Sequence, residues 1–110
     1  MSHYTYMWDF RVLPDRLDEF LRHYEDAGSW VLLFRRAPGY LGTRLLRDQD
    51  DPLRFLTIDD WESEEHYRAF RARYSNEYEA LDRMCAGLTS AESAVGQFNS
   101  TSPRIREREC

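Results

Sequence analysis

The sequence predicts an α+β fold built on a four-stranded antiparallel sheet, and three observations carry this prediction. Four segments have the alternating or turn-bounded pattern of strands, at residues 4–12, 40–47, 54–61 and 92–99. Two longer segments repeat apolar residues with the helical period. Their order within 110 residues is that of a single ferredoxin-like β-α-β-β-α-β domain.

The first strand and the helix after it follow from two periodicities. Residues 4–12 alternate large apolar side chains with mostly polar ones, which is typical of a half-buried strand. Pro14 suits a first helical turn. Apolar side chains then recur at helical spacing in Leu17, Phe20, Leu21 and Tyr24. Gly28 is placed to end this helix, and Ser29 to cap a short second one over residues 30–36.

The middle of the sequence predicts a hairpin followed by a second helical region. A polar loop at 48–52 joins the second and third strands. Ser63 is a suitable N-cap after the third strand. The helix that follows carries one apolar stripe, made of Tyr67, Phe70, Tyr74, Leu81, Met84 and Leu88. Ser75-Asn76 is expected to kink or restart this helix, and the last strand is expected at 92–99.

One face of the predicted sheet has no helix to cover it. Both long helices pack on the same face, yet the other face is not fully polar, since it draws on Leu41 or Leu46, Leu56, Ile58 and Val95. An exposed apolar surface of that kind usually marks an interface. We therefore expect a homodimer in which the two sheets pack together.

Composition narrows the class of protein. The net charge of -5 argues against a nucleic-acid partner, because phosphate neutralisation needs basic clusters. No signal peptide is visible, and the longest apolar run, 30–34, is too short for a membrane span. We expect a cytoplasmic protein with one domain over residues 1–99 and a flexible charged tail over 100–110.

The third strand contains the strongest indication of a site. Its alternation places Phe55, Thr57, Asp59 and Trp61 on one face. A strand that lines a small-molecule pocket needs such a mixture of aromatic rings, a hydroxyl and a carboxylate, whereas a plain core strand does not. The sequence therefore predicts the floor of a pocket here.

Other chemistry has little support. The three His residues lack metal-ligand spacing, so we expect no metal. Arg68, Arg71 and Arg73 have the pattern of a solvated helix face, and Cys85 that of a small core residue. No P-loop, dinucleotide-binding or hydrolase motif occurs.

The chain resembles the antibiotic biosynthesis monooxygenase family of the dimeric α/β-barrel superfamily over about residues 3–99. The likeness is carried by the segments Pro38-Gly39-Tyr40-Leu41-Gly42 and Asp60-Trp61-Glu62-Ser63, and by Tyr67. It implies that two sheets pack into an α/β barrel. It also implies a pocket between sheet and helices, in which some members oxygenate polycyclic aromatic compounds with O2 and without any cofactor.

The resemblance also implies roles for particular residues. In the anthrone-type oxygenases, catalysis involves an Asn and a Trp of the third strand and a Tyr of the next helix. Trp61 and Tyr67 match here, while Thr57 stands at the Asn position. A haem-degrading branch uses an Asn where this chain has Trp8 and a helix His that it lacks, so haem degradation is disfavoured.

From the residues themselves we expect Asp59 to be the general base, because burial beside Thr57 and Trp61 would raise its pKa. The alternative is that Asp59 pairs with an Arg or lies at the solvent end of the strand. We expect Trp8, Trp30 and Tyr24 to line the cavity, although such aromatic residues more often form plain core.

These features lead to a functional hypothesis with two alternatives. The hypothesis is cofactor-free oxidation of a small aromatic or quinol-like compound with O2. The first alternative is a non-catalytic dimeric module that binds an apolar metabolite, for example in a stress response. The second is an isomerase or cyclase that uses Asp59 as a proton shuttle.

Overall fold

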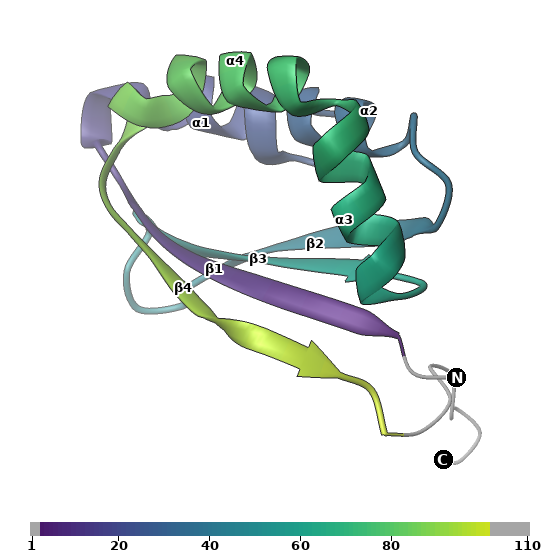
Figure 1. The fold of residues 1–110 in the computed structure, drawn as a ribbon. Helices are drawn as coiled ribbons and strands as arrows, with labels where there is room; N and C mark the ends of the chain where they lie inside the picture. Colours follow the sequence, from purple (N-terminus) through teal and green to yellow (C-terminus); the bar gives the residue numbers. More distant parts are fainter. Residues whose placement is uncertain (1–2, 102–110) are drawn as a thin grey trace.

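The computed structural model describes residues 3–101 as one sheet with helices on one of its faces (Figure 1). Residues 102–110, which hold most of the expected tail, lie outside the described part. The elements in chain order are β1 (Tyr4–Val12), the 3-10 turn η1 (Pro14–Arg16), α1 (Leu17–Tyr24), α2 (Ser29–Phe34), β2 (Tyr40–Arg47), β3 (Arg54–Trp61), α3 (Glu64–Arg73), α4 (Ser75–Cys85), the 3-10 turn η2 (Ala86–Leu88) and β4 (Thr89–Asn99).

The sheet has four antiparallel strands in the order β2-β3-β1-β4. This order and the sequence of elements confirm the predicted ferredoxin-like α+β fold. Two pairings position the site, since β1 and β3 place Trp8 opposite Thr57, and β2 and β3 place Thr43 opposite Asp59. Strand β4 begins three residues before its predicted start, because Leu88 is already fully buried and the chain extends directly after it.

The predicted break in the second helical region is present, because α3 ends at Arg73 and α4 begins at Ser75. Two details differ from the prediction. Gly28 rather than Ser29 is the N-cap of α2, and the Ser29 hydroxyl lies 2.8 Å from Nδ1 of His23 instead. Met84 is 58% exposed, whereas Cys85 takes the core position on α4.

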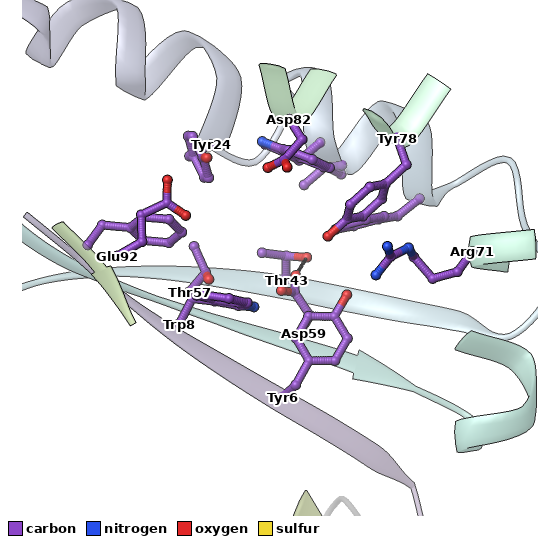
Figure 2. A pocket seen from close by; sticks show the side chains of 14 residues that line it. Tyr6, Trp8, Tyr24, Thr43, Thr57, Asp59, Arg71, Tyr78, Asp82 and Glu92 are labelled. Atoms are coloured by element: carbon purple, nitrogen blue, oxygen red, sulfur yellow. Dashed lines mark hydrogen bonds between the residues drawn. The ribbon is translucent and has the colours of Figure 1, made fainter. Parts of the chain in front are cut away.

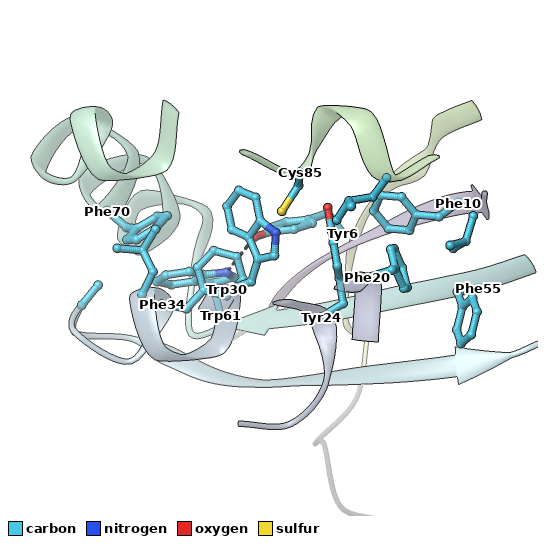
Figure 3. Close-up of a cluster of buried hydrophobic side chains, with 14 of the residues drawn as sticks. Tyr6, Phe10, Phe20, Tyr24, Trp30, Phe34, Phe55, Trp61, Phe70 and Cys85 are labelled. Carbon is cyan, nitrogen blue, oxygen red and sulfur yellow. Dashed lines mark hydrogen bonds between the residues drawn. The ribbon is translucent and has the colours of Figure 1, made fainter. Parts of the chain in front are cut away.

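The two faces of the sheet differ in burial as their alternation predicts. Phe55, Thr57, Asp59 and Trp61 are buried under the helices, and the residues between them are half-buried on the other face. Aromatic rings from β1, β3, α1, α2 and α3 form most of the core, and α4 contributes Cys85 (Figure 3). Leu46 and Phe98 are exposed on the open face, where they pair with Leu56 and Thr5, and Leu41 and Val95 are exposed at irregularities of the two edge strands.

The junction between β3 and α3 is held by local contacts. The hydroxyl of Ser63 accepts a hydrogen bond from the backbone N–H of His66 at 3.1 Å, which confirms the predicted N-cap. Gly39 packs on this first turn with a φ of 89°, and a Cβ atom there would lie 2.4 Å from Cγ of His66. The turn before β2 is therefore restricted to glycine at this position.

No helix within residues 3–101 is long and apolar enough to span a lipid bilayer.

Candidate functional site

A cavity of about 270 Å³ lies between the sheet and the helices (Figure 2). Most of its walls are aromatic, and its polar groups come from strands below and from α3, α4 and β4 at the edge. The lining residues are Tyr6, Trp8, Phe10, Tyr24, Trp30, Val31, Phe34, Thr43, Thr57, Asp59, Arg71, Tyr78, Asp82 and Glu92. Five of the predicted site residues are among them: Thr57, Asp59, Trp8, Trp30 and Tyr24.

The floor of the cavity carries the polar groups of the strands. Thr57 and Asp59 are each only 5% exposed, and they point up from β3 as the alternation predicted. Thr43 of β2 lies beside Asp59, and its hydroxyl donates a hydrogen bond of 2.5 Å to Oδ1 of that carboxyl group. We call Thr43, Thr57 and Asp59 the floor.

Asp59 is a buried carboxyl group that has no cationic partner within residues 3–101. None of the ion pairs found within residues 3–101 includes it, so the alternative reading of an Arg-paired or solvent-exposed Asp59 is wrong. Burial raises the pKa of Asp59 from its usual 3.8 to about 7. The hydrogen bond from Thr43 opposes this shift, and the negative charge of Asp60 adds to it. Asp59 can therefore gain and lose a proton near neutral pH.

The edge of the cavity carries charges that meet solvent. Arg71 of α3, Asp82 of α4 and Glu92 of β4 are exposed, and Tyr78 of α4 is half-buried among them. We call these four residues the rim. The guanidinium of Arg71 stacks on the Tyr78 ring at 3.8 Å from its centroid. Arg71 also donates a hydrogen bond of 3.0 Å from Nη1 to the hydroxyl of Tyr67.

The aromatic walls provide one unused hydrogen-bond donor. Within residues 3–101, Nε1 of Trp30 is the single buried side-chain nitrogen or oxygen atom without a hydrogen-bond partner. The Trp30 ring contacts Tyr24 and, edge-on, Tyr78. A buried donor that lacks a partner costs stability, and a ligand in the cavity could supply the missing acceptor.

Trp61 and Tyr67 lie next to the cavity rather than among its lining residues. Trp61 is fully buried, and its indole N–H donates to the hydroxyl of Tyr6 over 3.4 Å. Tyr67 lines an adjoining hollow that shares Tyr6, Trp8 and Arg71 with the cavity. The structure thus connects Trp61 to the cavity through Tyr6, and Tyr67 through Arg71. Burial and the nearby Asp59 charge raise the pKa of Tyr6, so its hydroxyl stays protonated.

Three residues that matter here were not predicted as site residues from the sequence, namely Arg71, Tyr78 and Thr43. Arg71 was expected on a solvated face, but its guanidinium lines the cavity mouth as well as meeting solvent. Tyr67 and Arg71 fall at i and i+4 on one side of α3, but the break at Tyr74 separates them from Tyr78 of α4, so the sequence offered no continuous pattern. Thr43 could be found only from the pairing of β2 with β3.

Within residues 3–101, no three His, Cys, Asp or Glu side chains converge as a metal site would require.

The fold and the site define an α+β domain with an aromatic cavity and a buried carboxyl group. The family model for antibiotic biosynthesis monooxygenase matches residues 4–80. The chain belongs to this family. No curated protein matches the sequence.

Solved structures share the fold at low sequence identity. SnoaB, a cofactor-independent oxygenase from Streptomyces nogalater, is 20% identical over 96% of this chain and 100% of its own, with a TM-score of 0.68. PA3566 from Pseudomonas aeruginosa is 16% identical over 93% of this chain and 97% of its own, with a TM-score of 0.72. A conserved protein from Methanosarcina mazei is 11% identical over 89% of this chain and 92% of its own, with a TM-score of 0.74. These likenesses establish the fold alone.

Proposed function

We propose that this protein is a cofactor-independent monooxygenase that oxidises a small aromatic or quinol-like compound with O2 in the cavity. The observation that carries this proposal is Asp59 at the floor of an aromatic cavity. It is a buried carboxyl group with a pKa of about 7, and no cation among the described residues pairs with it. A general base works best when its pKa is close to the working pH. Family membership and the fold shared with SnoaB support the proposal.

The first step is removal of a proton from the substrate. Asp59 takes a proton from an acidic C–H or phenol O–H, and the electron pair stays on the substrate as an aromatic anion. Thr57 and the Trp30 indole N–H, which both line the cavity, are donors available to the oxygen that carries this charge. The Arg71 guanidinium at the rim stabilises the same anion over a longer distance.

The second step is oxidation of the anion by O2. One electron passes to O2, and the two radicals join to a peroxide anion at the carbon that lost its proton. Protonated Asp59 returns its proton to this anion, which gives the hydroperoxide and restores the carboxylate. The hydroperoxide then loses water and leaves a carbonyl, so a CH2 group and O2 become a C=O group and H2O. Aromatic walls serve this step by excluding water from the reactive anion.

Anaerobic comparison tests this proposal. We expect anthrone to be converted to anthraquinone in air with uptake of one O2 per product, at a rate well above that of buffer alone. Without O2 the protein should bind anthrone but release no quinone. With 18O2, the new carbonyl oxygen should carry the label. If turnover is the same without O2, oxygenation is wrong and a proton shuttle by Asp59 is favoured.

A non-catalytic module that binds an apolar metabolite is the second candidate. The aromatic walls favour it, and so does the Trp30 N–H, which has no hydrogen-bond partner among residues 3–101. Both suit a bound ligand whether or not it reacts. This candidate predicts that anthrone binds and is recovered unchanged in air.

We further propose that the protein is a homodimer in which the open faces of two sheets pack together. The exposed apolar side chains of Leu41, Leu46, Val95 and Phe98 support this assembly. Sedimentation should give a mass of twice the chain, and Val95→Asp should shift it to a single chain. A monomeric wild-type protein would contradict the proposal.

A further inference from the structure

The hydroxyl of Tyr6 is a buried hydrogen-bond donor in the wall of the cavity. Tyr6 lines the cavity and is only 8% exposed, and its oxygen accepts the indole N–H of Trp61 over 3.4 Å. Trp61 is the single hydrogen-bond partner of this hydroxyl found within residues 3–101, so the O–H hydrogen has no acceptor there. A buried donor without an acceptor costs stability, and an oxygen atom of a ligand in the cavity would supply the acceptor.

Tyr6 stands directly beside the proposed base. The pairing of β1 with β3 places Tyr6 opposite Asp59, and directly opposite residues of an antiparallel pair have Cβ atoms about 5 Å apart. Figure 2 shows the two side chains entering the cavity from neighbouring strands. The Asp59 carboxyl group accepts its hydrogen bond from Thr43, so the Tyr6 O–H remains available to a ligand. A reacting atom within reach of Asp59 therefore lies close to Tyr6.

The proposed reaction forms two negative charges at different places on the substrate. The first anion carries its charge on the substrate's own oxygen, for which Thr57 and the Trp30 N–H are available. The peroxide anion forms later, at the carbon that lost its proton to Asp59, and so within reach of that carboxyl group. Tyr6 is the hydroxyl that the strand pairing places beside this carbon.

We propose that Tyr6 is a catalytic residue whose hydroxyl donates a hydrogen bond to the peroxide anion formed from the substrate and O2. The inference rests on the proposed function and assigns a residue to its second step. The hydrogen bond stabilises the negative charge as the electron passes to O2 and the C–O bond forms. Tyr6 keeps its own proton throughout, and Asp59 then supplies the proton of the hydroperoxide.

The surroundings of Tyr6 suit a donor that keeps its proton. Burial and the nearby Asp59 charge raise the pKa of Tyr6, so the hydroxyl is protonated near neutral pH. The ring packs on that of Tyr67 with 4.8 Å between their centroids, and the Trp61 N–H holds the oxygen. These contacts fix the hydroxyl before the peroxide forms, as a preorganised donor requires.

Tyr6→Phe and the control Tyr4→Phe test this role with anthrone as substrate. Each removes one hydroxyl from the buried face of β1 and keeps the ring, but Tyr4 donates to Gln97 and does not line the cavity. At saturating anthrone, kcat/KM for O2 should fall about 30-fold in Tyr6→Phe, less than for an isolated oxyanion donor because Asp59 still supplies its proton. Tyr4→Phe should stay within about twofold of the wild type. An unchanged kcat/KM for O2 in Tyr6→Phe would overturn the assignment.

Hydrogen exchange without O2 separates the peroxide from the first anion. In D2O under nitrogen, removal and return of a proton exchange the CH2 hydrogens of anthrone for deuterium, which 1H NMR follows. We expect the wild type to accelerate this exchange, Asp59→Asn to lose most of the acceleration, and Tyr6→Phe to retain it to within about twofold. If Tyr6→Phe slowed the exchange as much as the oxidation, Tyr6 would act on the first anion or on the cavity's shape, and its assignment to the peroxide would be overturned.

Binding of anthraquinone provides a measurement that does not depend on oxidation. One of its carbonyl oxygens corresponds to the carbon-bound oxygen of the peroxide, so a donor to the peroxide should also donate to this carbonyl group. We expect the infrared carbonyl stretch of bound anthraquinone at lower wavenumber in the wild type and Tyr4→Phe than in Tyr6→Phe. Equal wavenumbers in the wild type and Tyr6→Phe would overturn the inference. The expected infrared difference without any oxidation of anthrone would overturn only the proposed function.

Discussion

The floor and the rim of the cavity place similar chemical groups in opposite surroundings. Asp59 in the floor is buried and has a pKa of about 7, whereas Asp82 in the rim is exposed. A charge in the floor interacts strongly because little water screens it, and the same charge in the rim is largely screened. The floor is therefore suited to chemistry and the rim to attraction and orientation of the ligand.

The two regions also differ in how they are built. Floor residues come from paired strands, and their positions are fixed by the ladder of backbone hydrogen bonds. Rim residues come from three elements, α3, α4 and β4, and are held by side-chain contacts such as the stacking of Arg71 on Tyr78. Substitutions should thus have large effects in the floor and small ones in the rim.

The largest expected effect concerns the stability cost of Asp59 above neutral pH. Because its pKa is raised on folding, the folded state binds a proton between about pH 4 and 7 that the unfolded state has lost. Stability from this group is thus present at low pH and declines as pH rises through that window. The decline is on the order of 4 kcal/mol for a shift from 3.8 to about 7.

Denaturant titrations of the wild type and Asp59→Asn between pH 4 and 8 measure this decline. Asp59→Asn should be more stable relative to the wild type at pH 8 than at pH 4. Asp60→Asn is the matched control, since Asp60 lies on the other face of β3 and accepts a hydrogen bond from Thr5. The free energy of unfolding of Asp60→Asn should decline with rising pH as that of the wild type does. If the free energies of unfolding of the wild type and Asp59→Asn changed with pH in parallel, the raised pKa of Asp59 would be contradicted.

The next effect is the loss of activity in Asp59→Asn. An amide cannot accept the substrate proton, so we expect anthrone oxidation to fall about 100-fold or more. In the wild type, kcat/KM should rise with pH through about 7, because only the carboxylate form acts as the base. Asp60→Asn should stay within about threefold of the wild type, with its pH profile moved slightly to lower pH. Full activity in Asp59→Asn would remove Asp59 as the base.

The fold and most of the floor could be predicted from sequence because they depend on short periodicities. Strand alternation has a period of two, so Thr57 and Asp59 could be assigned to one face from the chain alone. Their burial confirms this assignment. Alternation could not predict that Trp61 lies outside the cavity lining. It assigns a side chain to a face of the sheet, but it does not say which other side chains cover it. Tyr6 separates Trp61 from the cavity.

Thr43 and the rim could not be predicted because they depend on register and on helix placement. Thr43 meets Asp59 only after a register shift between Tyr40 and Gly42, which no local pattern specifies. Arg71 and Tyr78 lie on either side of the break between α3 and α4. How the two helices meet there is decided by tertiary packing, so an exposed Arg was interpreted as part of a solvated face.

A smaller effect is expected from the rim cation. Arg71→Gln removes the charge that faces the cavity mouth, and we expect the affinity for an anionic aromatic probe such as anthraquinone-2-sulfonate to weaken about tenfold at low salt. Calorimetric titration at low and high salt measures this, and the difference should shrink at high salt. Arg68→Gln is the control, since Arg68 pairs with Glu64 and does not line the cavity. An equal loss in both variants would show a general charge effect rather than a rim contact.

The smallest expected effect is that of the Tyr67 hydroxyl. This hydroxyl accepts a hydrogen bond from Arg71, and Tyr67 is not among the residues that line the cavity. Tyr67→Phe should therefore hold Arg71 less firmly. We expect the affinity for the same probe to fall about threefold, which is the effect of losing one partly exposed hydrogen bond. Tyr74→Phe is the control, because its hydroxyl donates to the carbonyl of Arg36. Should Tyr67→Phe instead reduce anthrone oxidation as much as Asp59→Asn, the hydroxyl must reach the reacting atoms. Chemistry would then not be confined to the floor, and the division between floor and rim would fail at this residue.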